Sequence, residues 1–148
     1  MPDIFERVLL FKQSPIFSEV KTEDLRAVAQ ELQDEYFLAG ERIFDINEHS
    51  DHMYILVTGR VGISIHPDPR VKEFVAELGP GECFGEMSML DDLARSATVH
   101  VLEDSCALSL EKARLRALII HYPELALGML RGFSIRLREA HDRSKRAT

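Results

Sequence analysis

The sequence predicts a mainly β domain with helices at both ends, built on an antiparallel sheet of sandwich or barrel type. Three observations support this fold class. Residues 36–110 hold short apolar runs between turn residues, residues 1–34 show helical periodicity, and that periodicity returns after residue 110. Many short strands joined by closely spaced turns are typical of a sandwich or a barrel.

The chain is expected to form one domain, because it has 148 residues and an ordinary globular content of 45% hydrophobic residues. We expect an N-terminal helical segment at about 1–34, a β region at 35–110 and C-terminal helices over 111–148. No apolar stretch approaches the roughly 18 residues of a membrane span. The N-terminal MPDIFERVLLFKQ also lacks the layout of a signal peptide. We therefore expect a soluble cytoplasmic protein without membrane contact.

The N-terminal segment contains two expected helices. Ile4, Val8 and Phe11 fall on one face of the first, and Thr22 is placed to cap the second, TEDLRAVAQELQ. SPIFSEV, with its proline, is predicted to connect them.

The β region is predicted from alternation and from its turn signals. Val61, Ile63 and Ile65 alternate with small or polar residues, and so do Cys106, Leu108 and Leu110. Turn signals fall at 39–40, 47–48, 59, 66–70, 79–81 and 103–105. The two cysteines, Cys83 and Cys106, are expected to be small core residues, not a disulfide pair.

Two helices are expected at the C-terminal end. EKARLRALIIHY forms the first, and Pro123 suits the first turn of the second, where its missing N–H costs nothing. A heptad-like seam runs along that second helix through Ala126, Leu130, Phe133, Leu137 and Ala140. The seam fits packing within the domain or against a second copy, and we predict a homodimer through Leu130, Phe133 and Leu137.

The candidate ligand-binding residues lie in FGEMSMLDDLARSATV, residues 84–99. Glycines around Phe84 allow a ligand to approach the backbone, and Arg95 offers a planar fork suited to phosphate oxygens. Glu86 accepts hydrogen bonds only, so beside a phosphate it fits a ligand with hydroxyls. A sugar phosphate or nucleotide matches both groups. The alternative is that Glu86 and Arg95 form an ordinary ion pair that closes a loop.

The same stretch closely resembles the phosphate-binding cassette of the cyclic nucleotide-binding domain family, which includes Crp/Fnr-like proteins and protein kinase A regulatory subunits. The family pattern is Phe-Gly-Glu, an apolar stretch, then Pro-Arg-Ala-Ala-Thr-Val. AGERIFDINEHSDHMYILVTGRVGI and LGPGECFGE resemble its β-roll strands, and SPIFSEVKTEDLRAVA and HYPELALGMLRGFSIRLRE resemble its helices. The resemblance implies an antiparallel, jelly-roll-like β-roll with N-terminal helices and two C-terminal helices.

The resemblance also implies the roles of the site residues. Glu86 would bind the ribose 2′-hydroxyl, Arg95 would bind the cyclic phosphate, and backbone N–H groups would complete the cradle. The implied ligand-binding set is Phe84, Gly85, Glu86, Met87, Ser88, Arg95, Ser96 and Ala97. Three residues depart from the family pattern without removing a ligand-contacting group: Ala94 for proline, Asn47 for a turn glycine and Ser88 for alanine.

The base of the nucleotide is harder to predict. Ser96 follows the arginine both in members selective for cyclic GMP and in bacterial Crp-type activators that answer to cyclic AMP. Those activators contact adenine through hydroxyl residues late in the final helix, where this chain has Glu139, Ala140 and His141. Arg138 and His141 are weak candidates for base contact. The ligand is predicted to be cyclic AMP, with cyclic GMP as the alternative.

Other function classes fit the sequence less well. His49 and His52 are expected in a solvated loop, because no third ligand with zinc-like spacing follows. No catalytic set is visible, so we expect neither an enzyme nor a metal or cofactor. The net charge of −7 argues against DNA contact, and the basic tail from Arg131 onward fits a solvated helix end.

We expect a sensor or regulatory domain that signals through its C-terminal helix. Crp-like activators carry a DNA-binding domain after the long helix, and the given chain ends at Thr148. It is then a stand-alone sensor or the regulatory part of a larger protein with an output domain or effector. The alternatives are a degenerate domain that only mediates dimerisation and a truncated Crp-type transcription regulator.

Overall fold

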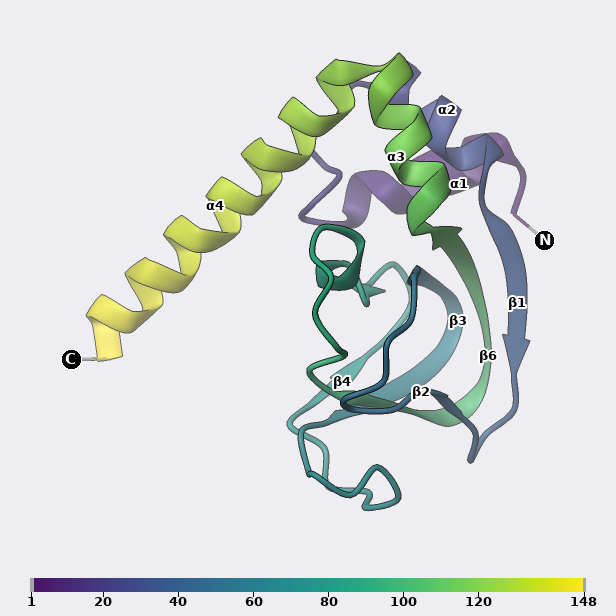
Figure 1. Ribbon diagram of the computed structural model, residues 1–148, viewed down its shortest axis with the longest axis vertical. Coiled ribbons are helices and arrows are strands. Elements are labelled where there is room, and N and C mark those ends of the chain that lie inside the picture. The colour runs from purple at the N-terminus through teal and green to yellow at the C-terminus, as the bar shows by residue number, and fades with distance from the viewer. Residues whose placement is uncertain (1, 148) are drawn as a thin grey trace. The chain divides into compact units, whose positions relative to one another are not determined.

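The computed structural model describes residues 2–147 and shows an antiparallel sheet, with helices before and after it in the chain (Figure 1). Met1 and Thr148, the ends of the predicted single domain, lie outside the described residues. The helices are α1 (Ile4–Gln13), α2 (Thr22–Gln30), α3 (Lys112–His121) and α4 (Pro123–Ala147). The strands are β1 (Gln33–Phe37), β2 (Arg42–Phe44), β3 (His52–Ser64), β4 (Ala76–Leu78), β5 (Cys83–Phe84) and β6 (Thr98–Glu111), and the 3₁₀ helix η1 spans Met87–Met89. The predicted fold class is confirmed.

Two long strands, β3 and β6, organise the sheet. They pair antiparallel from His52 opposite Glu111 to Ser64 opposite Thr98, and both curve strongly (Figure 1). Among the described residues the sheet order is β1-β6-β3-β4, while β2 also pairs with β6 and β5 with β3. The short strands β1 and β2 pair with β6, and the short strands β4 and β5 pair with β3. The two long strands therefore form the centre of the sheet, and the short strands lie on either side of them.

The expectation of short runs throughout the β region was therefore wrong for β3 and β6. Gly59 and residues 103–105, predicted as turns, lie inside these strands where the register shifts. Gly59 has φ +96°, and a Cβ there would lie 2.1 Å from the Ser105 Oγ atom. The turn signals mark an irregularity of β-bulge type, which bends a strand without ending it. Ile65 lies beyond the end of β3 and is 60% exposed.

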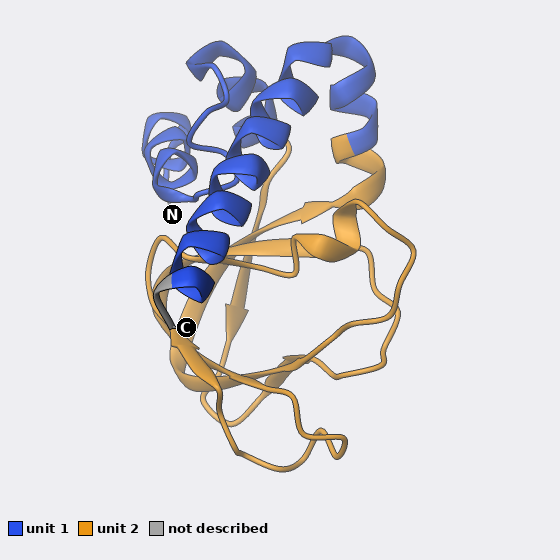
Figure 2. Ribbon diagram, turned by 90° about the vertical axis from the view of Figure 1, so that its left-hand side faces the viewer, with its two compact units in different colours: residues 1–30, 116–148 blue, residues 31–115 orange. Residues whose placement is uncertain are grey.

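Residues 31–115 form one of two compact units (Figure 2, orange). Its core is an apolar cluster inside the curved sheet: Phe44, Leu56, Val61, Phe84, Val99 and Ala107. Cys83 and Cys106 are not joined in a disulfide and are only half-buried, so they border the core instead of filling it. Partial burial raises the pKa of the Cys106 thiol.

Residues 1–30 and 116–148 form the other unit (Figure 2, blue). The Phe11 and Phe17 rings pack edge to face with centroids 4.7 Å apart. At Gly132 the backbone of α4 lies close to the Ile16 carbonyl oxygen, which a Cβ at this position would approach to 2.5 Å. The absence of a side chain therefore allows this contact. Pro123 is the first residue of α4, as predicted. Thr22 is the first residue of α2 itself, so the helix begins one residue earlier than a Thr22 cap would place it.

No helix among residues 2–147 combines the length and the apolar character needed to cross a bilayer.

Candidate functional site

The predicted cassette leaves the sheet at β5 and returns to it at β6. Phe84 ends β5, Gly85 turns the chain, η1 follows, and an irregular segment leads to Thr98. Of the predicted ligand-binding residues, Phe84, Ser88 and Arg95 are buried, Gly85, Glu86 and Ala97 are half-buried, and Met87 and Ser96 are exposed. The stretch is therefore neither a plain loop nor a strand, and its arginine points inward.

Arg95 is the central side chain of the site. It is only 3% exposed. Its Nε donates to the Ser50 Oγ atom at 2.7 Å, its Nη1 to the Gly85 carbonyl at 3.1 Å and its Nη2 to the His52 carbonyl at 2.5 Å. All three acceptors are neutral oxygens. These bonds hold the guanidinium, whereas the ion-pair interpretation expected the Glu86 carboxylate to do so.

The Arg95 guanidinium is a buried cation between an aromatic ring and several acidic groups. Its guanidinium carbon lies 3.9 Å from the centroid of the Phe44 ring, in a cation–π contact. Burial lowers the pKa of the guanidinium, while the partial or full negative charges of Tyr54, Glu48, Asp51 and Glu86 raise it. Burial of this cation is costly because its direct hydrogen-bond acceptors are neutral, and the nearby acidic groups offset only part of that cost.

Gly85 allows the guanidinium to lie against the backbone. Its φ of +79° is in the left-handed region, and a Cβ there would lie 2.7 Å from Arg95 Nη1 and 3.1 Å from the His52 carbonyl oxygen. A side chain at this position would displace the arginine or the strand. The glycine predicted for backbone approach to a ligand thus also makes room for the Arg95 side chain.

A loop before β3 is fastened to the cassette by its backbone. The Asn47 N–H donates to the Arg95 carbonyl at 2.8 Å, and the Arg95 N–H donates to the Glu48 carbonyl at 2.8 Å. Asn47 has φ +69°, a conformation that asparagine tolerates better than most residues. Its replacement of a turn glycine is therefore compatible with the fold.

Lys112 ties the far end of the cassette to the start of α3. Its Nζ donates to the Asp91 carbonyl at 2.6 Å and to the Asp92 carboxylate at 2.8 Å. A cavity of about 150 Å³ lies here, lined by His49, Ser50, Asp51, Ser88, Asp91, Asp92, Leu93 and Lys112. Sequence reasoning did not find Lys112, because nothing near it in the chain signals a contact with the cassette.

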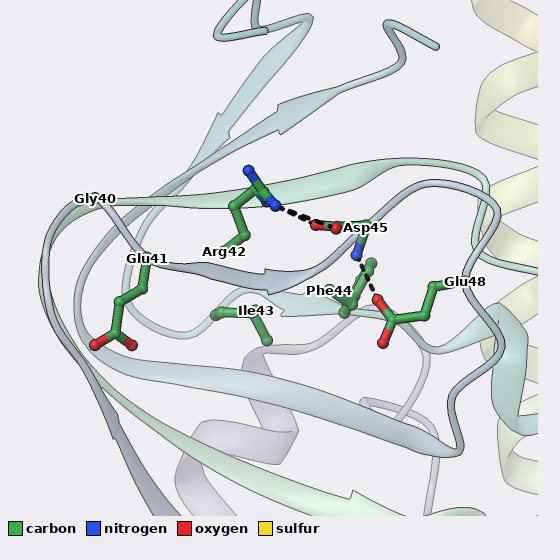
Figure 3. Close-up of a pocket in the computed structure, with 7 residues that line it drawn as sticks. All are labelled: Gly40, Glu41, Arg42, Ile43, Phe44, Asp45 and Glu48. Carbon is green, nitrogen blue, oxygen red and sulfur yellow. Dashed lines mark hydrogen bonds and ion pairs between the residues drawn. The ribbon is translucent and has the colours of Figure 1, made fainter. Parts of the chain in front are cut away.

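A second cavity of about 390 Å³ borders the Phe44 side of the site (Figure 3). It is lined by Gly40, Glu41, Arg42, Ile43, Phe44, Asp45 and Glu48. Arg42 pairs with the Asp45 carboxylate at 2.8 Å, and the Asp45 N–H donates to the Glu48 carboxylate at 2.8 Å, as Figure 3 shows. The Glu48 segment is thereby held at both its side chain and its backbone.

Three aromatic rings lie at the inner end of the site. Tyr54 stacks on Phe84 with centroids 5.3 Å apart and on Phe44 at 6.3 Å. Burial and the nearby Glu35 carboxylate raise the pKa of Tyr54 to about 12, so this phenol stays neutral at physiological pH.

The weak base-contact candidates lie on a different unit from the cassette. Arg138 and His141 are exposed residues of α4, which belongs to the helical unit, whereas the cassette belongs to the β unit.

The prediction that His49 and His52 both lie in a solvated loop was wrong for His52. His49 is exposed in a loop, but His52 is half-buried and begins β3, so a solvated loop does not hold both. The backbone carbonyl of His52 accepts from Arg95, a role that sequence reasoning missed. Within residues 2–147 no group of three or more histidine, cysteine or acidic side chains is placed to hold a metal ion.

The family model of the cyclic nucleotide-binding domain matches residues 34–122 of the chain. The chain belongs to this family. The match includes the whole cassette and the strands around it, so the resemblance seen in residues 84–99 extends across the β unit.

Known relatives agree with this assignment. The chain is 29% identical over 134 residues to a CRP-like cAMP-activated global transcriptional regulator of Mycobacterium tuberculosis, covering 90% of this chain and 59% of that protein. It is 34% identical over 112 residues to a cyclic nucleotide-gated potassium channel of Mesorhizobium japonicum, covering 76% of this chain and 30% of the channel. The chain thus spans less than two thirds of the length of each of these relatives.

A solved structure matches over most of its length. The N-terminal domain of a transcriptional regulator from Streptomyces coelicolor A3(2) superposes with a TM-score of 0.79 and 25% identity. The match covers 90% of this chain and 92% of that domain. A domain of this size and fold therefore occurs as the N-terminal domain of a larger regulator.

Proposed function

We propose that this chain is a cyclic nucleotide sensor domain that prefers cyclic AMP to cyclic GMP. The observation that carries the proposal is the buried Arg95 guanidinium, held in place by one hydroxyl and two carbonyl oxygens. A guanidinium has five N–H donors, and these three bonds leave others to meet a phosphate. Such charge-assisted bonds are among the strongest polar contacts in proteins.

The remaining cassette residues have roles that fit one ligand. Glu86 would accept from the ribose 2′-hydroxyl, since a carboxylate beside a phosphate is tolerable only if it receives hydrogen bonds. The backbone N–H groups of the cassette and the Ser96 hydroxyl would complete the phosphate cradle. The predicted binding set is Phe84, Gly85, Glu86, Met87, Ser88, Arg95, Ser96 and Ala97, with Arg138 and His141 as the weaker candidates for base contact.

The choice of cyclic AMP has support from a relative, because the similar regulator of Mycobacterium tuberculosis is described as cAMP-activated. Ser96 is compatible with either base. We propose that the chain is not an enzyme and that ligand binding shifts the equilibrium of α4, which transmits the signal to an output domain or effector. Transcription regulators and ion channels both occur among the relatives, so more than one kind of output fits.

Isothermal titration calorimetry with three ligands tests the proposal. We expect the unmodified chain to bind cyclic AMP more tightly than cyclic GMP, and adenosine far more weakly than either. Adenosine keeps the base and ribose but lacks the phosphate that Arg95 would bind. Absence of binding to both cyclic nucleotides would favour the alternative, a degenerate domain that mediates dimerisation.

We further propose that α4 forms a homodimer through Leu130, Phe133 and Leu137. Leu130 is 62% exposed and Leu137 71% exposed, while Phe133 is half-buried. Contacts within one chain therefore leave apolar surface of the seam uncovered, and a second copy could bury it. Light scattering should give twice the monomer mass, and Leu137→Asn should shift the protein toward monomer.

Ile135→Asn is the matched control for this dimer. Ile135 is 41% exposed on the same helix but points about 200° around the axis from Leu137. Its replacement should leave the mass unchanged. A monomeric unmodified chain at high concentration, with and without nucleotide, would contradict the dimer.

A further inference from the structure

We propose that Ser50, which lies outside the cassette, is a positioning residue for the phosphate site. It would hold the Arg95 guanidinium in its ligand-binding orientation. This inference rests on the proposed function, because it assigns a role at the same site. Ser50 is 45 positions from Arg95 in the chain, in the loop between β2 and β3.

The geometry sets Ser50 apart from the other two acceptors. The His52 and Gly85 oxygens are backbone carbonyls, and His52 is fixed in β3 by the sheet, so neither depends on a side chain. The Ser50 hydroxyl is the side-chain member of the three and accepts from Nε at 2.7 Å. Three acceptors on three different nitrogens define the plane of the guanidinium, and only the contact to Nε can be removed by substitution.

Ser50→Ala tests the role. It removes the acceptor of Nε and should weaken cyclic AMP binding about tenfold, as expected for loss of one hydrogen bond to a charged group. Ser50→Thr retains the hydroxyl and should restore most of the affinity. Ser105→Ala is the matched control, because the Ser105 Oγ atom also makes one 2.7 Å hydrogen bond, to the Glu103 carbonyl, and is 5% exposed. Its cyclic AMP affinity should match that of the unmodified chain.

A double-mutant cycle separates positioning from general loss of structure. Lysine has no N–H at the position of Nε, so Ser50→Ala should cost nothing further in an Arg95→Lys background if it acts through that atom. The Nε resonance of Arg95, followed by NMR without nucleotide, should also shift in Ser50→Ala and not in Ser105→Ala. Ser50→Thr should return it toward its original position.

The outcomes distinguish this role from the proposed function. If the unmodified chain binds neither cyclic nucleotide, the proposed function fails and the role of Ser50 fails with it. If the unmodified chain binds and Ser50→Ala binds equally well, the role of Ser50 alone is wrong. The same conclusion follows if the affinity loss persists undiminished in the Arg95→Lys background, since Ser50 would not then act through Nε.

Discussion

Replacing Arg95 with leucine should weaken cyclic AMP binding by at least about 100-fold, because at least two charge-assisted hydrogen bonds to the phosphate would be lost at about 1.5 to 3 kcal/mol each. The loss should be largest for ligands with a phosphate and small for adenosine. Calorimetry on the unmodified and substituted chains gives the ratio of dissociation constants directly. An unchanged affinity would show that Arg95 is not the phosphate ligand.

The control for Arg95→Leu is Arg70→Leu. Arg70 is an exposed arginine whose guanidinium already pairs with the Asp68 carboxylate at 3.1 Å, and its removal changes the net charge by the same amount. Its cyclic nucleotide affinity should be unaltered. Arg95→Lys should fall between the two, because lysine retains the charge but loses the planar fork.

Local signals predicted the parts of the fold that depend on neighbours in sequence. Pro123 begins a helix because its ring suits the first turn, and Asn47 adopts the positive φ that asparagine tolerates. Helical periodicity also located the four helices. These features follow from a few consecutive residues, so a single sequence is enough to find them.

The long strands were missed because a turn and a bulge share the same residue types. Gly59 and the Glu103–Ser105 segment look like turn signals when each strand is considered alone. Only their pairing shows that they oppose each other within two continuous strands. A property that depends on which strand lies opposite cannot be seen in either strand by itself.

In the candidate site, too, the sequence indicated the residues of one local motif and missed the residues that lie far away in the chain. Residues 84–99 form a compact motif, and its arginine and glutamate were found from the residue pattern and the family resemblance. Ser50 and His52, which hold Arg95, lie 45 and 43 positions away, and Phe44 lies beneath the guanidinium. The fold brings them together, and no local pattern marks a serine or a backbone carbonyl as an arginine partner.

Gly59→Ala should lower the free energy of unfolding by about 3 kcal/mol. The substitution forces an alanine to φ +96° and places its Cβ 2.1 Å from the Ser105 Oγ atom and 2.7 Å from the Asp104 carbonyl oxygen. Backbone strain of about 1 to 2 kcal/mol adds to an overpacking cost of about 1 to 3 kcal/mol. Because one of the clashing atoms belongs to the backbone of β6, the long β3–β6 pair must shift to relieve the contact. Urea unfolding at equilibrium measures the change.

Gly40→Ala separates the two costs. Gly40 has nearly the same φ, +93°, but a Cβ there meets no atom within 4 Å, so only the backbone strain of about 1 to 2 kcal/mol applies. Gly79→Ala has neither a positive φ nor a close neighbour and should leave stability nearly unchanged. If Gly59→Ala and Gly40→Ala were equally destabilising, the close approach of β3 and β6 at the bulge would carry no energetic weight. The excess for Gly59→Ala therefore measures how tightly the two central strands fit at the bulge that bends them around the core.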